Sequence, residues 1–251
     1  MTAPQITNRD RYLELIKRCL TGLIYGDPAQ DPWSGGAYDV NKRLIGRDWP
    51  LLAHSMIGKA RMDNLHVAVD HVLANKVPGD LIETGAWRGG ACILMRAVLA
   101  AHDVTDRIVY VADSFEGLPP PNEAKYSADT GDQHHTFKQL AVSLEEVQAN
   151  FTAYGLLDDQ VRFLKGWFKD TLPNCGIERL AVLRLDGDMY ESTMDALTAL
   201  FHKVSPGGVV IIDDYGVIAS CKAAVDEFRQ ARNITAPLQK IDYDGVYWIN
   251  S

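Results

Sequence analysis

One stretch of the chain decides the fold: Leu81-Ile-Glu-Thr-Gly-Ala-Trp-Arg-Gly-Gly90. It leaves an apolar strand, turns at Gly85 and enters a helix that begins near Ala91. Open α/β sheets bind ligands at the carboxyl ends of their strands, and glycine in the first turn lets the backbone approach the ligand closely. Turns that bind dinucleotides read GxGxxG, whereas Ala86 and Trp87 follow Gly85 here. The stretch therefore predicts a ligand-binding α/β sheet and disfavours an NAD-dependent oxidoreductase.

Short apolar strands alternate with helical segments after this stretch. The alternation predicts a parallel sheet that is covered by helices on both faces. Asp244-Gly245 is a dipeptide favoured in hairpin turns, so the sheet is expected to finish with an antiparallel hairpin. The expected strands are residues 81–83, 108–112, 161–164, 180–185 and 209–212, and the hairpin joins 238–241 to 246–249.

The chain is expected to form a single domain over residues 1–251. Apolar residues recur at helical spacing over 9–23 and again around 62–75. The segment 27–50 is rich in proline and glycine without periodicity, which is typical of a mobile substrate lid. Residues 1–60 would then hold the N-terminal helix and the lid, and 80–251 the sheet core, with an irregular insertion at 118–136.

Composition favours a small-molecule partner. The formal net charge of -8 disfavours sequence-independent binding to nucleic acid or to an anionic membrane. No apolar run is long enough to span a membrane, and residues 1–10 lack the pattern of an export signal. We therefore expect a soluble, cytoplasmic protein with reduced thiols, because no metal-ligand spacing or CxxC motif occurs among Cys19, Cys92, Cys175 and Cys221.

A carboxylate at the second strand end indicates a nucleoside ligand. Asp113 opens the sequence Asp113-Ser-Phe-Glu-Gly117, and a carboxylate there can accept hydrogen bonds from both hydroxyls of a ribose. The alternative interpretation is a helix N-cap. Trp167, after the third strand, could flank an adenine or belong to the core.

Four aspartates at two strand ends are the strongest feature. Asp186 and Asp188 follow the fourth expected strand, and Asp213 and Asp214 follow the fifth. If these strands are neighbours, four carboxylates meet at one sheet edge, and their repulsion requires a cation or a proton. All-oxygen ligation favours magnesium, with calcium or manganese as alternatives, and speaks against structural zinc. The other interpretation is that the aspartates only cap helices.

Two polar motifs lie between the second and third strands. His134-His135 belongs to the insertion, and a solvated loop or a substrate contact is favoured over metal ligation. Ser143-Leu-Glu-Glu146 reads as a capping box that opens a helix at 144–151, so its first interpretation is structural.

Together these residues resemble the macrocin O-methyltransferase family over nearly the whole chain. Six sequence blocks carry the resemblance, and together they are far more specific than a single glycine pattern. The blocks are Ile82-Glu-Thr-Gly-Ala-Trp-Arg-Gly-Gly90, Ala112-Asp-Ser-Phe-Glu-Gly-Leu-Pro119, Leu140-Ala-Val-Ser-Leu-Glu-Glu-Val147, Lys165-Gly-Trp-Phe-Lys-Asp-Thr-Leu-Pro173, Leu183-Arg-Leu-Asp-Gly-Asp-Met-Tyr-Glu-Ser192 and Ile211-Ile-Asp-Asp-Tyr215.

The resemblance implies a class I S-adenosylmethionine (SAM)-dependent methyltransferase, with a Rossmann-like α/β sheet of seven strands whose last strand is antiparallel. It implies metal ligation by Asp186, Asp213 and Asp214, and Asp188 as general base. The segment Ser55-Met-Ile-Gly58 resembles the part of the family that closes over the methionine end of the cofactor. The residues implied around SAM, including Trp167 as read above, are Met56, Glu83, Thr84, Gly85, Ala86, Asp113, Ser114, Ser143 and Trp167.

The activity that the resemblance implies is Mg²⁺-dependent methylation of a (deoxy)sugar hydroxyl on a natural product such as an aminocoumarin or macrolide antibiotic. Metal coordination would lower the pKa of the hydroxyl, and Asp188 would take its proton. The partners are then a glycosylated small molecule and, by analogy with such folds, a second copy in a homodimer. The alternatives are a metal-dependent catechol-type O-methyltransferase with a phenolic acceptor and a catalytically silent nucleoside-binding protein.

Overall fold

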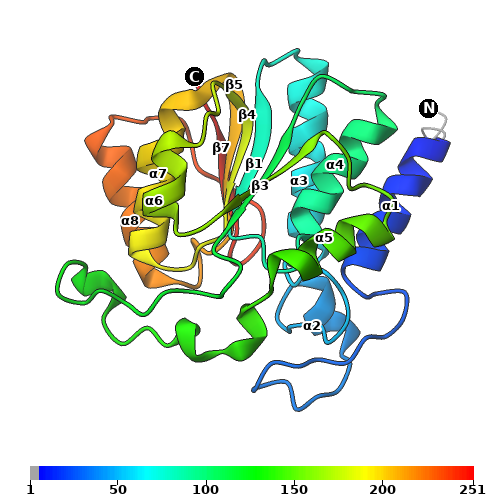
Figure 1. Cartoon of the computed structure of the whole chain (residues 1–251), viewed down its shortest axis with the longest axis horizontal. Coiled ribbons are helices and arrows are strands. Elements are labelled where there is room, and N and C mark those ends of the chain that lie inside the picture. The colour runs from blue at the N-terminus through cyan, green and yellow to red at the C-terminus, as the bar shows by residue number, and fades with distance from the viewer. Residues whose placement is uncertain (1–5) are drawn as a thin grey trace.

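The computed structural model describes residues 6–251. Its centre is a seven-stranded sheet in the order β3-β2-β1-β4-β5-β7-β6, with helices on both faces (Figure 1). Strands β1 to β5 run parallel to one another, whereas β7 pairs antiparallel with both β5 and β6. The predicted parallel sheet with a final antiparallel hairpin is confirmed. The strands are β1 Asp80–Thr84, β2 Val109–Asp113, β3 Val161–Lys165, β4 Leu180–Leu185, β5 Val204–Ile212, β6 Gln239–Lys240 and β7 Val246–Ile249.

Two apolar layers enclose the sheet. Successive residues of β1 contribute to opposite layers, Leu81 to the first and Ile82 to the second. Helices α1 Asn8–Leu20, α3 Gly58–Ala74, α4 Gly90–Ala101 and α5 Leu144–Ala153 supply the first layer. Helices α7 Tyr190–Leu200 and α8 Ala219–Ala231 supply the second, together with the short α6 Phe168–Thr171.

Helix α1 is shorter than the predicted range of 9–23. A reciprocal capping box between Thr7 and Asp10 begins the helix. It ends at Leu20, because Gly22 lies in the left-handed region at φ 70° and the chain turns away there. The turn directs the chain into the predicted lid.

The lid segment 27–50 is fixed around a buried arginine. Arg43 lies in the short helix α2 Val40–Leu44, and its Nε and Nη2 donate to the Asp48 carboxylate over 2.8 and 2.9 Å. The same guanidinium donates to the carbonyl oxygens of Thr21 and Asp27. A buried bidentate pair of this kind adds geometric specificity as well as energy to the fold of the segment. The predicted mobility of the lid stays a prediction.

Two further predictions concern membrane-spanning segments and the state of the cysteines. Among residues 6–251 no helix combines the length and the apolarity needed to cross a bilayer. The four cysteines are free thiols. The first half of the stretch 1–10, which was expected to lack an export signal, lies outside the described residues.

Candidate active site at the carboxyl edge of the sheet

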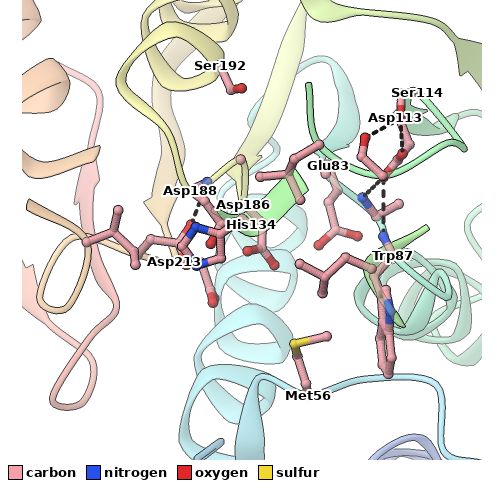
Figure 2. A pocket seen from close by; sticks show the side chains of 18 of the residues that line it. Met56, Glu83, Trp87, Asp113, Ser114, His134, Asp186, Asp188, Ser192 and Asp213 are labelled. Carbon is pink, nitrogen blue, oxygen red and sulfur yellow. Dashed lines mark hydrogen bonds between the residues drawn. The ribbon is translucent and has the colours of Figure 1, made fainter. Parts of the chain in front are cut away.

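A cavity of about 600 Å³ opens at the carboxyl ends of the strands. That volume lies within the usual range for small-molecule sites. Its walls come from the ends of β1, β2, β4 and β5 and from the insertion (Figure 2). The lid supplies a further part of the lining. Trp33 and Trp49 of the lid line it, so this segment borders the site as predicted.

The glycine turn after β1 is packed directly on the loop after β4. Gly85 has a φ of 91°, and a Cβ at this position would collide with the carbonyl oxygen of Asp186. Only glycine therefore allows this close approach. Gly90, at the start of α4, likewise allows a close approach, because a Cβ there would collide with the carbonyl oxygen of His54. This contact lies beside Met56, which lines the cavity.

Asp113 holds the glycine turn in place. Its Oδ2 accepts hydrogen bonds from the backbone N–H groups of Ala86 (2.7 Å) and Trp87 (3.3 Å). Its Oδ1 accepts one from Phe115 (2.8 Å). Burial raises the pKa of the Asp113 carboxyl, and these N–H donors oppose the shift. No helix begins directly after Asp113, since the next helical turn starts at Ser127, so the N-cap interpretation is wrong. Asp113 also lines the cavity, and its predicted contact with a ribose stays a prediction.

Two buried arginines that the sequence reading missed organise the acidic strand ends. Arg184 in β4 pairs with Glu83 and Asp213, and its Nη1 donates to Asp186 Oδ2 over 2.8 Å. Arg61 in α3 pairs with the other oxygen of Asp213. An arginine inside the otherwise apolar strand 180–185 was a signal, because a buried guanidinium needs carboxylate partners.

Arg61 also ties the hairpin turn to the site. Its Nε lies 3.2 Å from Asp242 and its Nη1 3.8 Å from Asp244. Burial raises the pKa of Asp244 to about 6, and the charge of Asp213 adds to the shift. The turn after β6 is thus part of the electrostatic surroundings of the strand ends.

The three predicted metal ligands converge. Asp186, Asp213 and Asp214 each offer one carboxylate oxygen, and these oxygens lie within 4.8 Å of one another. Burial and the neighbouring carboxylates raise the pKa values of Asp186 and Asp214 well above the usual range. Within residues 6–251 no cationic side chain pairs with Asp214, so the arginines leave one buried carboxylate uncompensated. This donor set fits a hard divalent cation.

Asp188 lies outside that group of three. It adopts a φ of 58°, which is uncommon for a residue with a side chain, and its backbone N–H donates to Asp214 Oδ2 over 3.2 Å. Its side chain lines the cavity (Figure 2). Burial raises the pKa of Asp188, and the nearby His134 opposes the shift. The role of Asp188 as general base stays a prediction.

The other predicted residues divide into two groups. Met56, Glu83, Gly85, Ala86, Ser114 and Trp167 line the cavity with those already described. Thr84 is buried within β1, and Ser143 is an exposed N-cap whose Oγ accepts from Glu146 N–H at the start of α5. Neither is among the residues that line the cavity, so their predicted cofactor contacts stay predictions. His134 lines the cavity and lies outside the three-carboxylate group, and its predicted role as a solvated loop residue or a substrate contact stays a prediction.

Comparison with known proteins identifies the family. The macrocin O-methyltransferase (TylF) family profile matches residues 9–250. The 8-demethyl-8-(2,3-dimethoxy-alpha-L-rhamnosyl)-tetracenomycin-C 4'-O-methyltransferase of Streptomyces olivaceus is 56% identical over 96% of this chain and 92% of its own length. The demethyldecarbamoylnovobiocin O-methyltransferase of Streptomyces niveus is 55% identical over 96% of this chain and 95% of its own.

Solved structures agree with this result. The structure of the O-methyltransferase NovP covers 97% of this chain and 100% of its own, with a TM-score of 0.93 and 54% identity. A calicheamicin methyltransferase, CalS11, shares the fold at 16% identity and a TM-score of 0.58, covering 99% of this chain and 98% of its own. The fold is that of the class I methyltransferases, as predicted. The chain belongs to the macrocin O-methyltransferase family and is a SAM-dependent O-methyltransferase.

Proposed function

We propose that the chain methylates a sugar hydroxyl on a natural-product glycoside, with Mg²⁺ at the three-carboxylate group. The observation that carries the proposal is the convergence of Asp186, Asp213 and Asp214 in one cavity with Asp188 and the glycine turn. The relatives support a glycoside, because one is named for a rhamnosyl tetracenomycin and another for a novobiocin precursor.

The residues of the site divide the work of the reaction. Asp186, Asp213 and Asp214 would hold the ion, which when bound lowers the pKa of a coordinated hydroxyl. Arg61 and Arg184 keep Asp213 in place. Each oxygen of this carboxylate has two lone-pair sites, so pairing with arginine leaves room for a metal bond.

Asp188 is the proton acceptor in this proposal. SAM would supply the methyl group when bound, and the Asp188 carboxylate would accept the proton that the acceptor hydroxyl loses. A base whose pKa is raised by burial is better matched to neutral pH than an exposed aspartate. Residues of the lid and of the insertion line the cavity, where they would shield the reaction from water and orient the two reactants.

A methylation panel tests the proposal. The purified chain would be incubated with SAM, Mg²⁺ and one acceptor, and products would be followed by mass spectrometry. The acceptors are demethyldecarbamoylnovobiocin and mycinamicin III, for each of which a relative is named, and a series of catechols. We expect transfer to at least one glycoside, loss of activity in EDTA and recovery with added Mg²⁺. Indifference to EDTA would contradict the metal role. Transfer to catechols alone would favour the phenolic acceptor, and SAM binding without any transfer would favour a silent binding protein.

A further inference from the structure

The proposed reaction does not use a histidine–aspartate pair in the insertion. His134 lines the cavity, whereas its neighbour His135 is exposed and is not a lining residue. Nδ1 of His134 donates to Asp132 Oδ2 over 2.7 Å, and the His134 backbone N–H donates to Oδ1 over 2.9 Å. Because an ionised carboxylate only accepts, the proton lies on Nδ1, and the ring is fixed with Nε2 on its free side.

Contacts made by the chain before and after the His134–Asp132 pair fix its position. Earlier in the insertion, the buried Asp129 accepts from the backbone N–H groups of Tyr190 (2.7 Å) and Glu191 (3.0 Å). These residues begin α7, which follows Asp188 almost directly. After the pair, the ring of Phe137 packs edge-on against His134, with ring centroids 6.2 Å apart, and against Trp49 of the lid at 5.5 Å. The position of His134 relative to Asp188 is therefore fixed by packing on both sides.

Nε2 of His134 is free for a ligand. Within residues 6–251 it has no hydrogen-bond partner. His134 and Asp188 form no ion pair, yet they line the same cavity (Figure 2). The hydrogen bond to Asp132 raises the pKa of His134, and the Asp188 carboxylate contributes in the same direction. A sugar hydroxyl suits this nitrogen in either protonation state, because a hydroxyl both donates and accepts.

We propose that Nε2 of His134 binds a second hydroxyl of the acceptor, next to the one that is methylated, and that Asp132 holds the imidazole for this contact. The inference rests on the proposed function, because it requires a sugar with adjacent hydroxyls. His134 is then a specificity residue of this chain: it selects acceptors whose neighbouring hydroxyl is free, unlike the 2,3-dimethoxy rhamnosyl compound for which the Streptomyces olivaceus relative is named, while Asp188 faces the reacting hydroxyl.

Steady-state kinetics test the inference on the glycoside that the wild-type chain methylates best in the panel. His134→Ala is expected to raise the acceptor KM about tenfold, because a hydrogen-bonding group of the acceptor is then left without a partner in the cavity. The KM for SAM and the thermal midpoint should stay at wild-type values. His134→Gln keeps a side-chain N–H and should recover part of the loss, and Asp132→Asn should give an intermediate acceptor KM. His135→Ala is the matched control and should behave as wild type.

Three results would overturn the inference. The first is an acceptor KM for His134→Ala that stays within about twofold of wild type. The second is an equal rise in both KM values for His134→Ala, His134→Gln and Asp132→Asn, which marks a structural role. The third is an equal effect of His134→Ala on an acceptor whose adjacent hydroxyl is methylated beforehand. Wild-type chain that binds SAM but methylates no glycoside would instead contradict the proposed function, and this inference with it.

Discussion

Asp213 and Asp214 are adjacent in sequence but differ in their electrostatic surroundings. Both oxygens of Asp213 pair with buried guanidiniums, from Arg61 and Arg184, whereas Asp214 has no cationic partner in the described chain. The acidic strand ends could be predicted, because the carboxyl ends of parallel strands meet at one edge. Arg61 could not, because an arginine in an amphipathic helix usually faces solvent and only the tertiary structure buries it.

Asp188→Asn tests the proton acceptor at the scale of one residue. Asparagine keeps the size of the side chain but does not accept a proton, so we expect kcat to fall by about 10²- to 10⁴-fold. The Kd for SAM, measured by isothermal titration calorimetry, should be unchanged, because the cofactor contacts remain. Full activity in this variant would remove Asp188 as the base.

At the scale of elements, the interior of the sheet was easier to predict than its irregular ends. Strand β4 has the predicted bounds, because 180–185 is an unbroken apolar run apart from Arg184. Strand β5 begins at Val204 instead of residue 209. The sequence Ser205-Pro-Gly-Gly208 resembles a turn, but Val204 still pairs with Leu180 across a shift in register. Tertiary pairing outweighs local propensity there.

The lid depends on one buried ion pair, which makes Arg43→Met an element-scale test. Removing the guanidinium leaves the Asp48 carboxylate buried without a partner, and the cost of breaking such a pair is about 3 to 5 kcal/mol of unfolding free energy. We expect this loss in urea denaturation, together with a higher acceptor KM, because Trp33 and Trp49 sit on the same segment. Lys42→Met is the matched control, since Lys42 pairs with no carboxylate in residues 6–251. Equal stability of the two variants would contradict this role of Arg43.

At the scale of the whole molecule, the site is assembled where three distant parts of the chain meet. The strand ends supply the carboxylates. Trp33, Trp49 and Phe137 form an edge-to-face cluster that joins the lid to the residue directly after the insertion. The glycine turn and the acidic pairs carry local motifs and were predictable. The aromatic cluster was not, because neither segment has periodicity and their contact depends on the folded sheet between them.

Metal binding should stabilise the whole fold, and Asp214→Asn separates stability from function. The raised pKa of Asp214 means that its ionised form disfavours the folded state, and this cost grows as pH rises above the pKa of the unfolded chain. We therefore expect Asp214→Asn to raise the thermal midpoint in EDTA at neutral pH. For the wild-type chain, Mg²⁺ at about 100 times its Kd should add about 2.7 kcal/mol, which corresponds to several degrees.

The variant should lose both this Mg²⁺-dependent shift and methyl transfer, because it lacks one of the three ligands. Differential scanning fluorimetry with EDTA and a Mg²⁺ titration measures the shift, and the exposed Asp159→Asn serves as the matched control that should keep it. Two results would show that the arginines already balance the charge at the strand ends. One is a wild-type thermal midpoint that does not change with Mg²⁺, and the other is an Asp214→Asn variant that is less stable than wild type in EDTA. The repulsion that favours a cation would then be absent, and with it the physical basis for placing a metal there.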